Sequence, residues 1–229
     1  MNTKDLILFL KEVPLFSHLD DDDFQQLTNI CTEKKFEKGQ TIFYEEDMGT
    51  GFYIIISGQV KIVMLSNDGR EHILGLLRER DFFGEMSILD GEPRSATAIA
   101  LSDTKAITIT REDFTKLLRN NPDMSIKIMF VLCKRLRRAD RHVESLAFLS
   151  APGRVARTVL EIADEQGIPD ADKIIINHKM TRQEFANIAG TSRETLTRVL
   201  MEFQDEGILD ISKNQIILVN KRLLKDKVI

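Results

Sequence analysis

One continuous helical pattern divides this sequence into two parts of different character. Between about residues 122 and 149, apolar side chains recur at alternating spacings of three and four residues, at Met129, Leu132, Leu136, Ala139, Val143 and Leu146. A heptad stripe of this length is typical of a helix that pairs with another helix. We therefore expect one long helix that forms the parallel seam of a homodimer. The alternative is a single amphipathic helix packed against its own domain.

Short β-rich segments fill the part before this helix. Glycine or Asx residues separate them, and they lie at residues 41–44, 52–56, 60–64, 72–77, 97–100 and 105–110. Asn67, Asp68 and Gly69 form a strong hairpin signal between two of these segments. Many short strands with regular turns predict a sandwich or a barrel-like roll. Short helices are expected ahead of the roll, at residues 9–19 and 24–30.

The part after the long helix begins with a helix-breaking segment, residues 150–153, which indicates a hinge or domain boundary. A helix at 155–165 and a strand at 173–177 are expected next. The chain then ends in two β-rich runs, 208–212 and 215–219, joined by Lys213 and Asn214. This pair predicts a β-hairpin that follows the helices described next.

Residues 180–200 have the spacing of a helix-turn-helix. Thr181 and Glu184 form a capping box that starts the first helix. Gly190 stands where a tight turn requires a positive φ, and Ser192 is a suitable N-cap for a second helix. The buried side of the second helix is expected at Leu196, Val199, Leu200 and Phe203. With the hairpin behind it, this motif predicts a winged helix that places its second helix in a DNA groove.

The exposed side of that second helix carries residues that can read bases. Arg193 and Arg198 can each donate a bidentate bond to guanine, and Glu194 can accept from the amino group of cytosine. Thr197 lies on the same side of the helix. The alternative is that Glu194 and Arg198 form only a surface ion pair.

A second motif lies between the strands, at residues 82–98. Gly84 precedes a short segment whose free N–H groups could face an anion. Arg94 offers a planar fork that matches a phosphate, Ser95 adds a hydroxyl donor, and Glu85 can accept from a sugar hydroxyl. The alternative is a turn with a surface ion pair between Glu85 and Arg94.

Composition and charge exclude several classes of protein. The net charge is −4: residues 1–124 hold 14 basic and 22 acidic side chains, residues 125–149 hold 6 and 2, and residues 150–229 hold 12 of each. DNA binding must therefore depend on a local patch rather than on a bulk positive field. Two cysteines, Cys31 and Cys133, exclude a disulfide scaffold or an iron–sulfur cluster on one chain.

The same reading predicts a cytoplasmic protein that is not an enzyme. No apolar run is long enough to cross a membrane, and the N-terminus has no secretory signal. No nucleophile–base pair and no cluster of metal ligands stands out, so we expect no metal.

Taken together, the motifs resemble the CRP/FNR family of bacterial transcription regulators over nearly the whole chain. The resemblance rests on three groups in order: Gly84-Glu85 with Arg94-Ser95-Ala96-Thr97, Leu146-Ala147-Phe148-Leu149 with Gly153-Arg154-Val155-Ala156, and Ser192-Arg193-Glu194-Thr195 with Arg198. The implied fold is α+β: a cyclic-nucleotide-binding β-roll, a dimerisation helix and a winged helix-turn-helix. The implied boundaries are residues 1–121, 122–149 and 150–229.

The resemblance also implies roles for individual residues. Glu85 would bind the ribose 2′-hydroxyl, and Arg94 and Ser95 would bind the cyclic phosphate, with backbone groups of Gly84 and Ala96. Bases would be read by Arg193, Glu194 and Arg198, while phosphates of the DNA would be held by Thr181 and Gln183. The implied DNA is a pseudo-palindrome with half-sites like TGTGA, and RNA polymerase is an implied further partner.

The identity of the effector is less constrained than the fold. In the branch that responds to cyclic AMP, two hydroxyl residues on the long helix contact the adenine, and Ala139 and Asp140 stand at those positions here. A carboxylate only accepts hydrogen bonds, which suits the adjacent N1 and N2 donors of guanine. The sequence thus predicts cyclic AMP, with cyclic GMP as the alternative and Asp140 as the residue that contacts the base. Asp140 could equally be a solvated residue paired with a neighbouring arginine.

Other functions consistent with the sequence are a regulator of this fold that senses haem or redox state or binds no ligand, and a nucleotide-binding module that regulates a partner protein.

Overall fold

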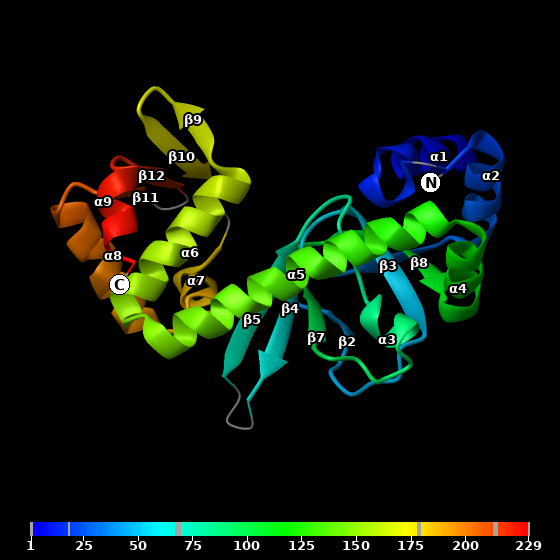
Figure 1. Cartoon of the computed structure of the whole chain (residues 1–229), viewed down its shortest axis with the longest axis horizontal. Coiled ribbons are helices and arrows are strands. Elements are labelled where there is room, and N and C mark those ends of the chain that lie inside the picture. The colour runs from blue at the N-terminus through cyan, green and yellow to red at the C-terminus, as the bar shows by residue number, and fades with distance from the viewer. Residues whose placement is uncertain (1, 18, 67–69, 178–179, 213–214, 229) are drawn as a thin grey trace. The chain divides into compact units, whose positions relative to one another are not determined.

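The structure, a computed structural model, describes residues 2–17, 19–66, 70–177, 180–212 and 215–228. These residues form two compact units, Met1–Leu136 and Arg137–Ile229 (Figure 1). The three-part division expected from the sequence stays a prediction, because the long helix contributes residues to both units.

The described residues of the first unit form two four-stranded antiparallel sheets and five helical segments ahead of the long helix. The helical segments are α1 (Thr3–Glu12), η1 (Pro14–Phe16), α2 (Asp21–Ile30) and α4 (Arg111–Asn120), and the four-residue helix α3 (Met86–Leu89) lies between strands. One sheet has the order β1-β8-β3-β6 and the other β2-β7-β4-β5. The strands are β1 (Thr32–Phe36), β2 (Thr41–Phe43), β3 (Gly51–Ser57), β4 (Val60–Leu65), β5 (Glu71–Leu77), β6 (Phe82–Phe83), β7 (Thr97–Ala100) and β8 (Thr104–Thr110).

Strand β3 shows why this unit has two cores. Successive side chains of a strand point to opposite faces of the sheet. Phe52 and Ile54 therefore enter the core shared with the helices, where the ring of Phe52 stacks on that of Phe114 at 4.2 Å. Tyr53 and Ile55 enter a second core on the other face of the sheet. A strand that is apolar on both faces is the signature of a buried central position.

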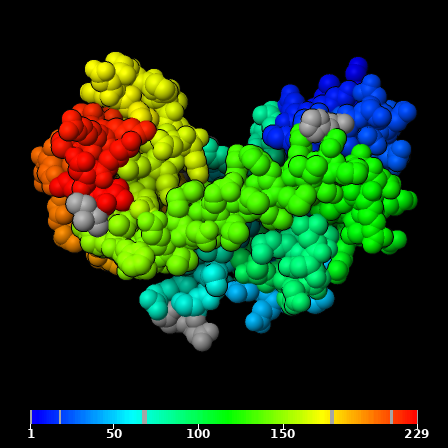
Figure 2. All heavy atoms as spheres, in the orientation of Figure 1, coloured from blue at the N-terminus to red at the C-terminus, as the bar shows by residue number. Residues whose placement is uncertain are grey.

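The long helix, α5 (Pro122–Phe148), has a buried beginning and an exposed stripe. Met124 and Ile128 are 2% exposed and belong to the first unit's core, and Leu132 packs against the same core. Leu136 and Val143 are 63% and 66% exposed. Figure 2 shows the green and yellow-green atoms of this helix uncovered along the face that is turned to the viewer. The apolar stripe is therefore only partly accounted for by packing against the chain's own core.

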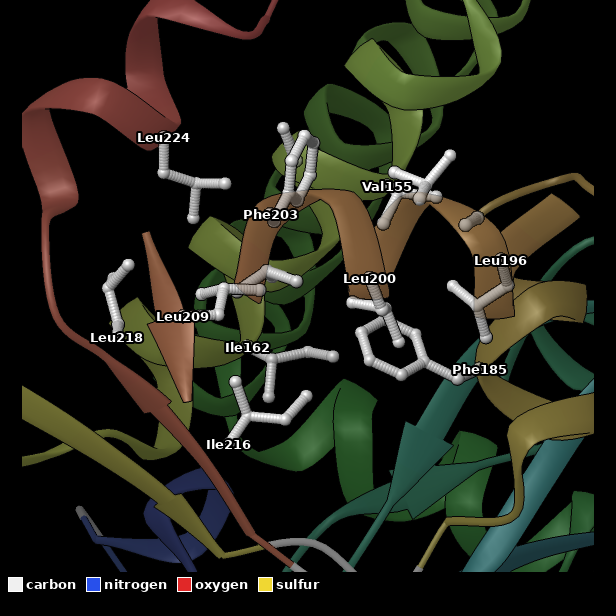
Figure 3. Packing of buried hydrophobic residues seen from close by; sticks show 14 of the residues in the cluster. Val155, Ile162, Phe185, Leu196, Leu200, Phe203, Leu209, Ile216, Leu218 and Leu224 are labelled. Carbon is white, nitrogen blue, oxygen red and sulfur yellow. The ribbon is translucent and has the colours of Figure 1, made fainter. Parts of the chain in front are cut away.

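The second unit is a winged helix built on one core. Its helices are α6 (Ala151–Gln166), α7 (Arg182–Ile188), α8 (Arg193–Asp205) and α9 (Lys221–Asp226), and its sheet has the order β11-β12-β10-β9. The strands are β9 (Ile168–Asp170), β10 (Lys173–Asn177), β11 (Leu209–Ser212) and β12 (Gln215–Leu218). Figure 3 shows Phe185 of α7, Leu200 and Phe203 of α8 and Ile162 of α6 converging on this core.

The expected fold class is confirmed, with differences in detail. The helix expected at 9–19 is wrong, because α1 ends at Glu12 and Pro14 opens a separate 3-10 turn. Strand β1 was not expected, since its charged sequence is that of an exposed edge strand. The turns at Asn67-Asp68-Gly69 and Lys213-Asn214 lie outside the described residues. None of the helices in the described ranges combines the length and apolar character needed to cross a bilayer.

Candidate functional site

A buried arginine forms the centre of the motif at residues 82–98. Arg94 is 4% exposed, and its guanidinium donates to the carbonyl oxygens of Gly84 (2.6 Å) and Gly51 (2.7 Å) and to Oγ of Ser87 (2.8 Å). The same group lies 4.2 Å from the ring centre of Phe43. The alternative of a surface ion pair between Glu85 and Arg94 is wrong, because both side chains are buried and each has other partners.

The charge of Arg94 has no carboxylate partner within the described part of the chain. Its direct partners are neutral oxygens, and its Nε–H is buried without a hydrogen-bond acceptor. Burial lowers the pKa of Arg94, while Tyr53, Glu85 and Asp47 act in the opposite direction at longer range. A buried cation with a spare donor and no counter-ion is matched by an anionic ligand that accepts from it. The residues present therefore fit a phosphate group.

Glycines make room for this arrangement. A Cβ on Gly49 would lie 2.0 Å from Oγ of Ser87 and 3.3 Å from Cζ of Arg94. Gly84 has a φ of +80°, and a Cβ there would lie 2.7 Å from Nη1 of Arg94. Any side chain at either position would displace the guanidinium or its hydroxyl partner.

An ion pair joins the long helix to the same motif. Glu85 is 1% exposed, and its Oε1 accepts from Nη1 of Arg135 on α5 at 2.5 Å. Nη2 of Arg135 donates to the carbonyl oxygen of Phe82 at 2.5 Å, and its guanidinium lies over the ring of that residue. Arg135 therefore holds Glu85 in place from the helix side.

The other residues expected at this site lie in different surroundings. Ser95 is exposed and donates to the sulfur of Met86 at 3.6 Å, and Ala96 is buried at the start of β7. Asp140 is exposed on α5 and belongs to the second compact unit, so its expected contact with a base stays a prediction.

The helix-turn-helix has the caps that its sequence indicates. Oγ1 of Thr181 accepts from the N–H of Glu184 at 3.2 Å, and the Thr181 N–H donates to the Glu184 carboxylate at 2.7 Å. Gly190 has a φ of +61°, and Oγ of Ser192 accepts from the N–H of Thr195 at 3.1 Å. The four apolar side chains expected to be buried on α8 are each 2% exposed or less: Leu196, Val199, Leu200 and Phe203.

The outer face of α8 carries charges of both signs. Its first turns expose Arg193, Glu194 and Arg198, and its last turns expose Glu202 and Asp205. The pKa of Glu194 is lowered by a hydrogen bond from its own backbone N–H and by the Ser192 hydroxyl, so this carboxylate stays ionised. The alternative of a surface pair between Glu194 and Arg198 is wrong, because Nη1 of Arg198 bonds to Glu202 at 2.6 Å.

The residues expected to hold DNA phosphates lie at the start of α7. Thr181 is exposed and engaged in its capping box, and Gln183 is exposed and donates to Oδ1 of Asn187 at 2.8 Å. Between them, Arg182 has a pKa lowered by burial and a buried Nη1 without an acceptor in the described chain.

Sequence reasoning missed several residues of the first site. Arg135 is one of five basic residues flanking the heptad stripe, and no local signal distinguishes it from the others. Gly49 and Gly51 precede the motif by more than thirty residues. The pairing of β3 with β6 and the backbone bonds of Arg94 with Glu46 and Asp47 bring them to it. Among the described residues, no three His, Cys, Asp or Glu side chains gather into a metal-binding group. Burial raises the pKa of the Cys31 thiol to about 12, so this thiol is protonated at neutral pH.

Two family models match the chain over the two regions just described. The cyclic nucleotide-binding domain matches residues 33–121, and the Crp-like helix-turn-helix domain matches residues 153–227. The first range includes Glu85 and Arg94, and the second includes both helices of the helix-turn-helix.

Curated relatives cover almost the whole chain. The CRP-like cAMP-activated global transcriptional regulator of Mycobacterium tuberculosis is 31% identical over 94% of this chain and 96% of its own length. The cyclic AMP receptor protein of Thermus thermophilus is 33% identical over 95% and 97%. Among solved structures, the c-di-GMP responsive global regulator CLP of Xanthomonas campestris superposes with a TM-score of 0.74 at 25% identity, covering 88% of this chain and 100% of that one.

The close approach at Gly49 gives a prediction for the first site. Gly49→Ala should lower the free energy of unfolding by about 1–3 kcal/mol, because the added methyl group must displace Ser87 and Arg94. Gly75→Ala is the matched control, since no atom lies within 4 Å of its Cβ position. Denaturant unfolding of both variants measures the difference. Equal stabilities would show that the glycine is not required for the packing around Arg94.

Proposed function

We propose, since the chain belongs to the CRP/FNR family of transcription regulators, that a cyclic nucleotide binds beside Arg94 and Glu85 and controls DNA binding by the winged helix. Cyclic AMP is the first candidate, because the names of the curated relatives from Mycobacterium tuberculosis and Thermus thermophilus refer to it. The observation that carries this proposal is the buried guanidinium of Arg94, which has neutral partners only and one donor left over.

The cyclic phosphate would supply the negative charge that Arg94 lacks. A phosphodiester oxygen can accept from the Nε–H, which is buried without a partner in the described chain. Ser95, exposed at the same loop, has a hydroxyl that can turn toward the phosphate, because its present acceptor is only a thioether. Backbone groups at Gly84 and Ala96 complete the proposed phosphate site.

Glu85 is suited to the sugar. Arg135 bonds to Oε1, and the second oxygen of a carboxylate can accept from a ribose 2′-hydroxyl. Arg135 would then hold the buried carboxylate in a fixed orientation. This ion pair links the proposed ribose site to the long helix.

For DNA we propose that α8 enters the major groove with its N-terminal end. Arg193, Glu194 and Arg198 project from this end, and the positive end of the helix dipole adds to the attraction for the backbone. Thr181 and Gln183 are assigned to phosphates. The proposed site is a palindrome with TGTGA-like half-sites, and contact with RNA polymerase stays an expectation.

The uncovered stripe of α5 is assigned to a homodimer. Apolar side chains as exposed as Leu136 and Val143 are costly to leave in water when they are aligned along one helix face. A second copy of the same helix would bury them by heptad packing. Two copies also present two reading helices to the two half-sites of a palindrome, about 34 Å apart.

The effector site predicts a nucleotide-binding defect. Arg94→Ala should weaken cyclic AMP binding at least about 10-fold, since each charge-assisted bond contributes ~1.5–3 kcal/mol. Arg80→Ala is the control, because Arg80 is exposed and pairs with Glu12. Calorimetry with cyclic AMP, cyclic GMP and cyclic di-GMP measures both variants against wild type, and thermal unfolding checks their folding. A wild type that binds none of the three would refute the nucleotide proposal.

The same titrations address the choice of base. If Asp140 accepts from a guanine edge, Asp140→Thr with Ala139→Thr should shift the ratio of affinities toward cyclic AMP. An unchanged ratio would show that Asp140 does not contact the base.

We predict that charged substitutions in the exposed stripe of α5 abolish the dimer. Leu136→Lys with Val143→Lys should reduce the mass in light scattering to that of one chain, 26.2 kDa, because charged residues cannot be buried unpaired in a seam. Leu132 is left unchanged because it packs against the first unit's core. Lys134→Glu is the control, since Lys134 lies on the opposite side of the heptad. A dimeric double variant would place the interface elsewhere.

The reading helix predicts a difference between two kinds of contact. On a TGTGA palindrome, Arg198→Ala should lose ~1–3 kcal/mol of binding free energy, and much less on a copy whose guanines are replaced. Gln183→Ala should weaken binding to both DNAs by similar factors. Titrations at one fixed salt concentration measure this. If Arg198→Ala loses the same factor on both DNAs, Arg198 does not read a base.

A further inference from the structure

One guanidinium joins the ends of two helices in the second unit. Arg154, in the first turn of α6, donates from Nη1 to the carbonyl oxygen of Leu149 at 3.0 Å. Its Nε donates to the carbonyl oxygen of Ala189 at 3.2 Å, and its Nη2 to that of Gly190 at 3.1 Å. Leu149 follows the last residue of α5, and Ala189 and Gly190 form the turn of the helix-turn-helix.

The carbonyls of Leu149 and Ala189 lie at helix ends, where helix geometry leaves them without partners, and that of Gly190 follows the C-cap of α7. The last carbonyls of a helix have no intrahelical donor, and they carry the negative end of the helix dipole. Leu149 continues the bonding of α5, since its N–H donates to the Ser145 carbonyl at 3.0 Å, and Ala189 is the C-cap residue of α7. Two negative helix ends therefore face a single cation, which caps both of them.

Apolar packing supports the same junction. A Cβ on Gly190 would lie 2.8 Å from Cδ2 of Leu146, so the side chain of Leu146 lies directly against the turn. Gly190 is two residues ahead of Ser192, the N-cap of the reading helix α8. The start of α8 is thus fixed by the turn, and the turn is fixed to the last turn of α5.

A neighbouring arginine provides a useful contrast. Arg157, one turn further along α6, donates to Oγ of Ser145 at 2.8 Å and to the Glu144 carboxylate at 3.1 Å. Both partners belong to α5, and none of its recorded bonds goes to the turn. Arg154 therefore differs from Arg157 in joining the long helix to the DNA-reading motif.

We infer that Arg154 is a positioning residue that makes the end of α5 and the turn before α8 move as one body. Its role is to transmit a change at the end of α5 to the orientation of the reading helix. This rests on the proposed function only for the source of that change, the nucleotide, because the bonds of the junction are all made by the chain's own groups.

Two substitutions test the inference in the full-length protein. Arg154→Ala removes all three bonds, while Arg154→Lys keeps the charge but loses the planar fork that reaches three carbonyls. Asp164→Ala is the matched control: it removes an exposed ion pair with Lys221 from the same helix, away from the turn. Thermal unfolding and the amide exchange of the α8 core, at Val199 and Leu200, report any general loss of folding.

The first measurement is amide hydrogen exchange of the turn without nucleotide or DNA. Exchange at Ala189 and Thr191, whose N–H groups bond to the Phe185 and Ala186 carbonyls, should be about 5- to 30-fold faster in both Arg154 variants than in wild type or Asp164→Ala, with the α8 core unchanged. Exchange in the turn at the wild-type rate in both variants would overturn the inference, whatever the protein's effector is.

The second measurement is the affinity for the TGTGA palindrome with and without cyclic AMP. The Arg154 variants should bind this DNA more weakly, and the ratio of the two affinities should fall toward one while cyclic AMP affinity in calorimetry stays at the wild-type value. Faster exchange with unchanged DNA affinity and unchanged ratio would overturn the positioning role and leave a local cap only. If wild-type DNA binding does not respond to the nucleotide, nucleotide control fails, and the exchange rates and the DNA affinity without ligand still decide the role of Arg154.

Discussion

The packing of the first unit depends on one constraint: the positive charge of Arg94 is buried without a carboxylate beside it in the described chain. Arg94 is satisfied by carbonyls of Gly51 and Gly84 and by the Ser87 hydroxyl, so the loop and two strand ends must all reach it. Small residues at Gly49 and Gly84 follow from this requirement, since a Cβ at either place would collide with the group or its partner. The remaining donor makes the arrangement complete only with an anion. The packing of this site therefore follows from burying the charge of Arg94, whichever ligand binds there.

In the second unit the main constraint is that the N–H and C=O groups at the helix ends need hydrogen-bond partners. Two of its helices, α7 and α9, are only 7 and 6 residues long, so terminal groups make up a large share of their backbone. Thr181 and Ser192 cap the N-termini of α7 and α8, and Arg154 caps the C-terminal ends of α5 and α7 together. The caps at Thr181 and Ser192 bond within their own helices, whereas the bonds of Arg154 join α6 to the ends of α5 and α7. The apolar core then needs only to fill the space that they define.

Local patterns predicted the second unit better than the first. The caps at Thr181 and Ser192, the positive φ of Gly190 and the buried stripe of α8 are set by residues within a few positions of one another. Strands β3 and β7 near Arg94 were predicted, but β6 was not. Gly51, a partner of Arg94, and Arg135, the partner of Glu85, are distant in sequence and have no spacing that points to them. Edge strand β1 was missed because its exposed lysines hide it. The heptad stripe did not reveal that Leu132 faces the first core, since a helix with two apolar faces shows one merged pattern.

The pair between Arg198 and Glu202 bears on how the protein searches a chromosome. Non-specific affinity for DNA grows with the number of phosphates that basic residues neutralise. Here the part of the chain that carries the reading helix has no net positive charge, and α8 places acids directly behind its base-reading end. Those acids repel the phosphates of any DNA sequence. A guanine at the proposed contact would instead take over part of the hydrogen bonding that Glu202 provides to Arg198. If Arg198 reads a guanine as proposed, weak non-specific binding makes occupancy of the correct site depend on base recognition more than on electrostatic attraction.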